Sequence, residues 1–272
     1  MMDKLKVLNR NALKIIAIIT MAMDHIAPVI FEAGSLWWTV FRFLGRLTFT
    51  IMIYLLADGF RYTRDLKKYI SRMFIFSIIS LFTFSFLETG SWLPVQIVPG
   101  KFENYAFSHF YIASIDKTVC VSAFSVITNL LLALLTLTVW EKTNWKTPLK
   151  VLATAVMLVI SMNCDWLYLP IILALNFYYL RDRKCAKWCV YILVSALCIF
   201  NVGLPANRLA SAEYINVSFK LYRTGMLLLP VLIEVFYNGL PGKKTAFGKW
   251  FFYVFYPAHQ VVIGLIAMFV NQ

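Results

Sequence analysis

Long apolar runs separated by short polar segments dominate this chain of 272 residues. Several runs reach the roughly 18–20 apolar residues that a helix needs to cross a membrane core about 30 Å thick. The pattern predicts membrane-spanning helices over nine runs: 12–31, 37–60, 69–87, 119–140, 149–163, 166–180, 188–204, 218–238 and 250–270. The expected fold is all-α, a polytopic integral membrane bundle of about nine helices.

Composition supports a membrane protein over a soluble one. Hydrophobic residues make up 61% of the chain and charged residues 14%, against roughly 45–50% and about 25% in soluble domains. No linker or repeat divides the sequence, so residues 1–272 are expected to form a single membrane-embedded domain. The longest stretch between predicted spans, 88–118, is too apolar for a disordered loop and is expected to fold back as an extracytoplasmic cap.

Positive charge falls mainly on one side of the predicted bundle. The formal net charge is +13. With the N-terminus in the cytoplasm, only Lys101, Lys117 and Arg208 fall in loops on the opposite side. Because Lys and Arg beside span ends resist translocation, this bias predicts a cytoplasmic N-terminus. We therefore assign the basic excess to topology, with membrane lipids as the surroundings and no nucleic acid as a partner.

Ionisable residues inside the predicted spans mark a candidate site, since each costs roughly 2.5–3.5 kcal/mol to insert. Asp24 and His25 lie in the first span, Arg42 and Arg46 in the second, and His259 in the last. At about 1.5 Å per residue, His25 lies ~20 Å along its helix. Arg46 and His259 each lie ~14 Å along theirs. These depths place the three residues in one central layer.

Helical phase suggests partners for these groups. Asp24 lies ~100° round the helix from His25, so the two do not form an intrahelical pair. Arg46 is the preferred partner of Asp24, with a structural ion pair that only fixes helix packing as the alternative reading. Arg42 lies one turn from Arg46 on the same face. Lys14 shares the face of His25, ~16 Å nearer the cytoplasmic end of the helix.

Two prolines add to the pattern, because each removes a backbone hydrogen bond beside a candidate histidine. Pro28 frees the carbonyl of Asp24, and Pro257 frees that of Tyr253. Such breaks are tolerated inside a membrane where the freed groups are buried in protein or line a cavity. In the eighth span, Glu234 is expected to pair with a basic neighbour that the sequence does not identify.

Four motifs, in this order, resemble the TraX family, named for the protein that acetylates the N-terminus of conjugative pilin. They are the Asp24–His25 pair, GRLTFTIMIYLLADGFRYT at 45–63 followed by KKYISRMFIFSIIS, CDWLYLPIIL at 164–173, and KWFFYVFYPAHQVVI at 249–263. TraX-like proteins are in turn similar to the type 3 membrane acyltransferases, which move acetyl groups from cytoplasmic acetyl-CoA to an acceptor beyond the membrane. Those enzymes carry arginine where this chain has Lys14.

The resemblance implies an acyl-CoA-dependent acetyltransferase of the bacterial cytoplasmic membrane. Its donor would be acetyl-CoA, and its acceptor a peptide amine such as a pilin N-terminus, or a glycan hydroxyl. His25 is the candidate general base, and Asp24 would organise the polar groups around it. Arg46 would stabilise the oxyanion or hold the pantetheine end of the donor. His259 would be a second acid–base group or a hydrogen-bond donor to the thioester.

A second group of residues would bind the donor: Lys14, Arg42, Arg61, Arg64 and Tyr256. The alternative for Arg61 and Arg64 is a plain inside-positive loop. No metal site is expected, because the three histidines lack a ligand-like spacing. The leading alternative function is a proton-coupled transporter with Asp24 and His25 as a proton relay, and a structural scaffold comes third.

Overall fold

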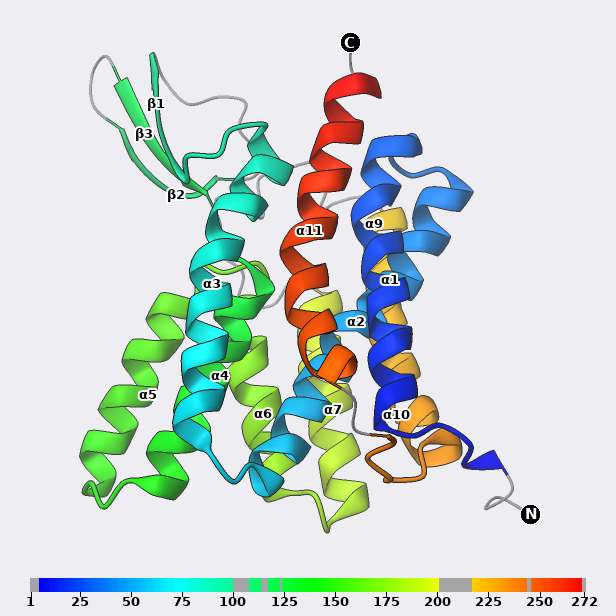
Figure 1. Cartoon of the computed structure of the whole chain (residues 1–272), viewed down its shortest axis with the longest axis vertical. Coiled ribbons are helices and arrows are strands. Elements are labelled where there is room, and N and C mark those ends of the chain that lie inside the picture. The colour runs from blue at the N-terminus through cyan, green and yellow to red at the C-terminus, as the bar shows by residue number, and fades with distance from the viewer. Residues whose placement is uncertain are drawn as a thin grey trace. The chain divides into compact units, whose positions relative to one another are not determined.

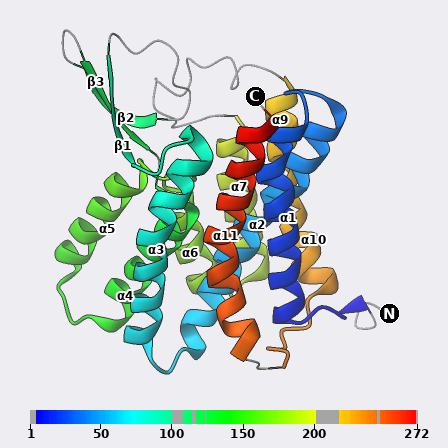
Figure 2. The ribbon, with the colours of Figure 1, turned by 45° about the horizontal axis from the view of Figure 1, so that its top comes forward.

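The computed structural model describes residues 5–99, 108–113, 117–122, 124–200, 217–243 and 246–270. Most of them are helical (Figures 1 and 2). The longer helices are α1 (Arg10–Ile30), α2 (Leu36–Tyr62), α3 (Leu66–Thr89), α4 (Val126–Lys142), α5 (Thr147–Ser161), α6 (Leu169–Tyr179), α7 (Lys184–Ile199) and α11 (Ala246–Val270).

The helices follow the predicted apolar runs, and α1, α2, α3 and α11 are long and apolar enough to cross a membrane. Helices α5 and α6 are apolar but shorter. These helices and the composition make the chain a membrane protein. The number of spans and the orientation of the N-terminus stay predictions.

The sequence analysis predicted one helix over 119–140, and this prediction is wrong. Residues Lys117–Ser122 form strand β3, and α4 begins only at Val126. Strand β3 pairs antiparallel with β1 (Val95–Pro99) on one side and with β2 (Ser108–Ala113) on the other. The predicted loop 88–118 therefore contains most of a small sheet, and its role as a cap stays a prediction.

The run 218–238 is also not a single helix. It divides into α9 (Val217–Arg223), a 3₁₀ turn at Thr224–Leu227, α10 (Leu228–Val231) and a π-helical turn at Leu232–Phe236. Pro230 causes part of this break, because it lacks the N–H that would bond the carbonyl of Met226. The Tyr191 hydroxyl donates to that carbonyl instead, at 2.7 Å.

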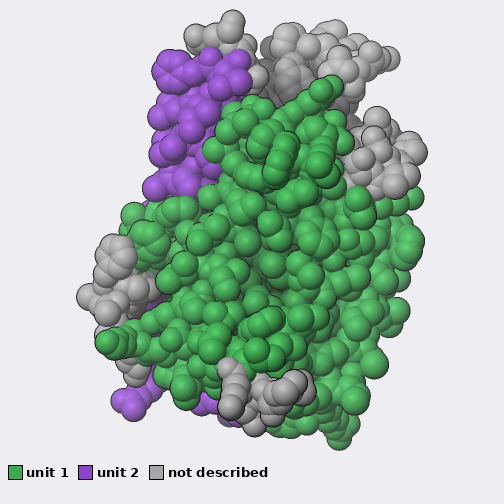
Figure 3. All heavy atoms as spheres, turned by 90° about the vertical axis from the view of Figure 1, so that its right-hand side faces the viewer, with its two compact units in different colours: residues 1–55, 179–255 green, residues 56–178, 256–272 purple. Residues whose placement is uncertain are grey.

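The chain forms two compact units, coloured separately in Figure 3. Unit 1 comprises residues 1–55 and 179–255, and unit 2 comprises 56–178 and 256–272. The chain therefore passes from one unit to the other three times, within α2, at the end of α6 and within α11. Each unit is described by itself below, and the expectation of a single domain stays a prediction.

In unit 1, backbone hydrogen bonds join the N-terminus of the chain to the segment that follows the π-helical turn. The N–H of Leu8 donates to the carbonyl of Phe236, and the N–H of Asn238 donates to the carbonyl of Leu8, both at 2.9 Å. The Asn11 side chain donates to the carbonyl of Lys243 at 2.7 Å. The first turn of α1, which Asn9 caps, is thereby fixed beside residues 236–243.

In unit 2, α3 and α4 lie side by side, with the Ser77 and Thr128 hydroxyls hydrogen-bonded at 2.8 Å. Helix α5 packs on α4, where the Trp140 indole donates to Thr154 at 2.9 Å. The turn between α4 and α5 and the N-terminus of α3 lie at one end of this unit, and the sheet lies at the other (Figure 1). Five lysines belong to the helix ends and the turn at the first of these ends: Lys67, Lys68, Lys142, Lys146 and Lys150.

Candidate functional site

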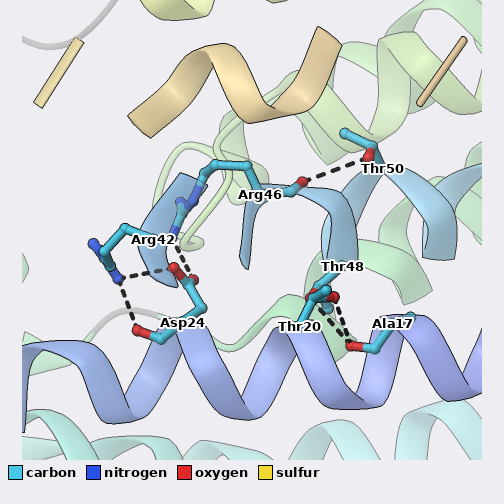
Figure 4. A network of polar contacts seen from close by, with 7 residues as sticks. All are labelled: Ala17, Thr20, Asp24, Arg42, Arg46, Thr48 and Thr50. Atoms are coloured by element: carbon cyan, nitrogen blue, oxygen red, sulfur yellow. Dashed lines mark hydrogen bonds and ion pairs between the residues drawn. The ribbon is translucent and has the colours of Figure 1, made fainter. Parts of the chain in front are cut away.

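A buried ion cluster joins α1 and α2 in unit 1 (Figure 4). Arg46 Nη2 bonds Asp24 Oδ2, and Arg42 Nη1 lies 3.3 Å from Asp24 Oδ1. Side-chain exposure is 13% for Asp24, 22% for Arg42 and 12% for Arg46. The predicted pairing of Asp24 with Arg46 is confirmed, and Arg42 joins the same carboxylate. One acid therefore bridges two guanidinium groups away from water.

The proline in α1 contributes directly to this cluster. Pro28 leaves the Asp24 carbonyl without its helical N–H partner, and Arg42 Nη1 donates to that carbonyl at 3.4 Å. Arg42 therefore contacts both the main chain and the side chain of Asp24. The sequence analysis expected the carbonyl freed by Pro28 to be buried in protein or to line a cavity. It is buried and bonded to Arg42.

Tyr222 of α9 is a member of the cluster that the sequence analysis missed. Its ring centroid lies 5.1 Å from the guanidinium carbons of both Arg42 and Arg46, and 5.9 Å from that of Arg223. Trp38 meets the ring edge to face at 5.3 Å. Tyr222 is 5% exposed, so these cation–π contacts are largely desolvated, the condition under which they are strongest.

Two glycines allow the three segments to approach this closely. A Cβ on Gly45 of α2 would overlap the side chain of Asp24, and a Cβ on Gly225 would overlap the carbonyl of Phe43. Glycine is the residue that lets helix backbones meet at such short range. Gly225 follows Tyr222 by three residues, and it is the one local signal in the sequence that a close approach occurs there.

Beside the ion cluster, nearer the start of α1, hydroxyl groups continue the contact between α1 and α2 (Figure 4). The Thr20 and Thr48 hydroxyls lie 2.8 Å apart, and Thr48 also donates to the Ala17 carbonyl at 3.1 Å. All three residues are buried. The two helices are therefore held by polar contacts over several turns, which fixes the depth of Asp24 against Arg46.

His25 is half-buried on α1 and leaves the helix ~100° round from Asp24. It is next to the ion cluster along the chain but projects from a neighbouring face of α1. Lys14 is half-buried in the same helix, on the face of His25. The structure thus brings together Asp24, Arg42 and Arg46 from the predicted set, with His25 beside them.

The remaining predicted site residues belong to unit 2. The rings of Tyr256 and His259 meet edge to face at 5.4 Å, and both residues are buried. The Tyr256 hydroxyl accepts a hydrogen bond from the Val126 N–H at 3.3 Å. Arg61 and Arg64 are exposed near the turn between α2 and α3.

At the same turn, Asp65 caps α3 by accepting from the Lys68 N–H at 3.0 Å. This backbone hydrogen bond, with an ion pair to the Lys68 ammonium, lowers the pKa of the Asp65 carboxyl below its ordinary value. The Asp65 cap therefore fixes the start of α3 beside Arg61 and Arg64. This holds whether the two arginines only set the membrane orientation or also bind a ligand.

Glu234 has partners that the sequence did not identify. Lys187 Nζ and Lys184 Nζ each lie 3.3 Å from its carboxylate, and the Trp188 indole donates to it at 2.8 Å. The Lys187 side chain is 7% exposed and lies 4.5 Å from the Trp188 ring centroid. A second, separate ion cluster thus joins α7 to the π-helical turn.

Comparison with known proteins gives a family. Residues 9–100 and 107–267 match the family described as TraX protein. The chain belongs to the TraX family. It is also similar to the "Probable fimbrial assembly protein FimC, serogroup H1" of Dichelobacter nodosus, with 29% identity over 260 residues. That alignment covers 95% of this chain and 96% of the relative. No solved structure matches the chain.

Proposed function

We propose that this TraX-family chain is a membrane acetyltransferase of the bacterial cytoplasmic membrane, taking acetyl groups from cytoplasmic acetyl-CoA. The observation that carries the proposal is the cluster of Asp24, Arg42 and Arg46, held on the Tyr222 ring beside His25. Fixed positive charge in a site shielded from water acts strongly on developing negative charge. Membership of the TraX family supports acetyl transfer as the chemistry that uses it.

The reaction assigns a role to each of these groups. His25 accepts a proton from the acceptor amine as its nitrogen bonds to the thioester carbonyl carbon. The carbon–sulfur bond then breaks, coenzyme A leaves as the thiolate, and the proton returns to its sulfur. Arg46, with Arg42 beside it, offsets the negative charge that builds on the carbonyl oxygen. Asp24 keeps the two guanidinium groups in place during these steps.

The donor is proposed to enter at the basic ends of the helices. Lys14 lies along the His25 face of α1, and Lys and Arg are common ligands of phosphate groups. Arg61, Arg64 and Tyr256 are the proposed donor-binding residues of unit 2. His259, packed on Tyr256, is proposed as a second acid–base group or as a hydrogen-bond donor to the thioester.

The acceptor is proposed to be the N-terminal amine of a pilus or fimbrial subunit. The relative from Dichelobacter nodosus is named a fimbrial assembly protein, which favours a peptide over a glycan. Amine acceptors also suit a histidine base, since the amine must be neutral to attack and must lose a proton afterwards.

Transfer of labelled acetyl groups tests the proposal directly. Protein in lipid nanodiscs is incubated with [1-¹³C]acetyl-CoA and a peptide that carries a free amino terminus. The same peptide with a blocked amino terminus and an oligosaccharide serve as comparison acceptors. Labelled peptide should form with wild type and should fall at least about 100-fold in His25→Asn, because general base catalysis contributes about 10²–10⁴-fold. The neighbouring Ile26→Leu is the matched control.

Two results would contradict this assignment. Unchanged transfer by folded His25→Asn would remove the base. No binding of acetyl-CoA to wild type would favour the proton-coupled transporter, and pH-dependent flux across proteoliposomes would then be the relevant measurement.

A further inference from the structure

The turn between α4 and α5 has a fixed geometry at one end of unit 2 (Figure 1). Lys150 Nζ reaches from α5 and donates to the Trp140 carbonyl of α4 at 2.8 Å. The Trp140 indole donates in turn to the Thr154 hydroxyl at 2.9 Å, and the Thr143 hydroxyl donates to the Val139 carbonyl at 2.6 Å. The side chains that the turn exposes are therefore presented by two helices bonded to each other.

Positive charge exceeds negative charge on this turn. Lys142 and Lys146 are exposed, and within the described ranges no ion pair involves either of them. The one acid in the sequence from 126 to 164 is Glu141, which accepts a hydrogen bond from the Tyr178 hydroxyl at 3.0 Å. The turn therefore carries net positive charge towards its surroundings.

The start of α3 adds to this charge. Helices α3 and α4 run antiparallel, joined by the hydrogen bond between Ser77 and Thr128. Lys67 lies ~15 Å along α3 from Ser77, and Lys142 lies ~21 Å along α4 from Thr128. The two lysines are thus within about 6 Å of the same level. Lys67 is also exposed, so one end of unit 2 presents positive charge from two places in the chain.

One face of α5, with the residue just before its first turn, continues from these lysines as an exposed apolar stripe. Its members recur every three or four residues, the spacing of one helical face. Each is 45–73% exposed: Trp145, Leu149, Leu152, Val156 and Val159. From Leu149 to Val159 the stripe is ~15 Å long, half of a hydrocarbon core about 30 Å thick. Its length therefore matches the depth of one leaflet.

Charge and apolar surface together decide what fits here. A soluble phosphate compound such as coenzyme A would use the lysines but leave the apolar stripe uncovered. A zwitterionic lipid would cover the stripe but bring a cation of its own to the lysines. An anionic phospholipid satisfies both parts, because Lys and Arg beside a membrane attract its headgroup. Trp145 lies between the two parts, where tryptophan is enriched at membrane interfaces.

We propose that Lys67, Lys142 and Lys146 bind the headgroup of an anionic phospholipid, with Trp145 and the α5 stripe against an acyl chain. Lys150 holds the two helices together through the Trp140 carbonyl and acts as a positioning residue. The site uses none of the residues proposed above for acetyl transfer. Each of the two proposals can therefore fail without the other.

Lipid titration followed by native mass spectrometry tests the site. The whole chain in detergent is titrated with dioleoylphosphatidylglycerol, which is anionic, and with dioleoylphosphatidylcholine, which has the same acyl chains. Wild type should bind the phosphatidylglycerol more tightly. Each lysine beside an anionic headgroup contributes roughly fivefold to the affinity. Lys142→Gln combined with Lys146→Gln should therefore weaken phosphatidylglycerol binding by roughly 25-fold and leave phosphatidylcholine binding nearly unchanged.

The matched control removes two cations from unit 1, Arg181→Gln combined with Lys184→Gln. Both side chains are paired with carboxylates, those of Asp182 and Glu234, so this variant should keep the wild-type preference. Inorganic phosphate and coenzyme A are then added as competitors, each against sodium chloride of equal ionic strength, because salt alone screens exposed charges. Displacement of the lipid by either competitor would overturn the proposal in favour of a soluble phosphate compound.

The inference is wrong if wild type binds the two lipids equally, a measurement that needs no variant to fold. It is also wrong if the folded double lysine variant keeps the wild-type affinity for phosphatidylglycerol. Acetyl transfer by a wild type that shows no lipid preference would leave the proposed function standing and remove this site. A lipid preference lost in the double variant, without any acetyl transfer by wild type, would support the site and contradict the proposed function.

Discussion

Replacing Asp24 by asparagine should destabilise the protein far more than a typical surface substitution. The change removes one negative charge and leaves two guanidinium groups facing a neutral amide. The Arg42–Asp24 pair alone, at 3.3 Å, has a Coulomb energy of about 5 kcal/mol at an effective dielectric constant of 20. Desolvation offsets much of this gain, and removing one partner of a buried pair costs about 3–5 kcal/mol.

Thermal unfolding in detergent or nanodiscs measures this loss. By the scaling of globular chains, about 3–5 kcal/mol corresponds to a fall in Tm of roughly 10 °C. Asp182→Asn is the matched control, because the same substitution there affects an exposed carboxylate paired with Arg181. Exposed pairs contribute about 0–1 kcal/mol, so that variant should unfold near the wild-type temperature.

A triple variant separates stability from function. Asp24→Leu combined with Arg42→Met and Arg46→Met replaces all three charges by apolar side chains of comparable size. Such replacements are often neutral or stabilising, so Tm should return towards wild type while acetyl transfer stays absent. An Asp24→Asn protein as stable as Asp182→Asn would refute the energetic reasoning. A triple variant with full activity would show that the cluster only holds helices together.

Other variants test neighbouring contacts. Tyr222→Phe keeps the ring and should retain stability and transfer activity, whereas Tyr222→Leu should lose about 2 kcal/mol and most activity; equal behaviour of the two would exclude the cation–π contacts. Gly225→Ala should lower the free energy of unfolding by about 1–3 kcal/mol, because the added Cβ would overlap the Phe43 carbonyl. A variant as stable as wild type in thermal unfolding would contradict that close approach. Lys187→Met should destabilise by about 1.5–3 kcal/mol, the range for a hydrogen bond to a charged group, because the Glu234 side chain is 31% exposed and keeps Lys184 as a partner. Adding Glu234→Gln should recover part of this loss in a double-mutant cycle, and additive losses would mean that the two side chains are not coupled.

Sequence reasoning located the ion pair because the two helices that carry it are consecutive. A short connection makes α1 and α2 neighbours, and the rise per residue then places Asp24 and Arg46 at matching depth. Tyr222 was beyond this reasoning. It comes from a segment far along the chain, and no depth argument relates a broken helix to α1. Only Gly225 hinted that its backbone touches another helix.

The two errors in secondary structure have a common physical origin. A short apolar run satisfies a strand as well as a helix. The predicted span therefore begins with VCVS at 119–122, although Val favours strands and these residues belong to β3. The run 218–238 was judged by hydrophobicity alone. Pro230 lacks the N–H of a helical hydrogen bond and Gly225 has a low helix propensity. The Tyr191 hydroxyl that compensates for Pro230 is a tertiary contact.

Unit 1 consists of two segments that are far apart in the chain, and their order determines the order in which they are synthesised and inserted. Its first part ends at residue 55 and its second begins at residue 179, so α1 and α2 emerge from the ribosome long before Tyr222 exists. Two lone charges would each oppose insertion by about 2.5–3.5 kcal/mol, but a hairpin enters with Asp24 and Arg46 already paired. We therefore expect residues 1–62 to insert in a cell-free translocation assay, and Asp24→Asn to reduce that insertion. The ion pair would then first lower the cost of inserting α1 and α2 into the bilayer, and only later form part of a site.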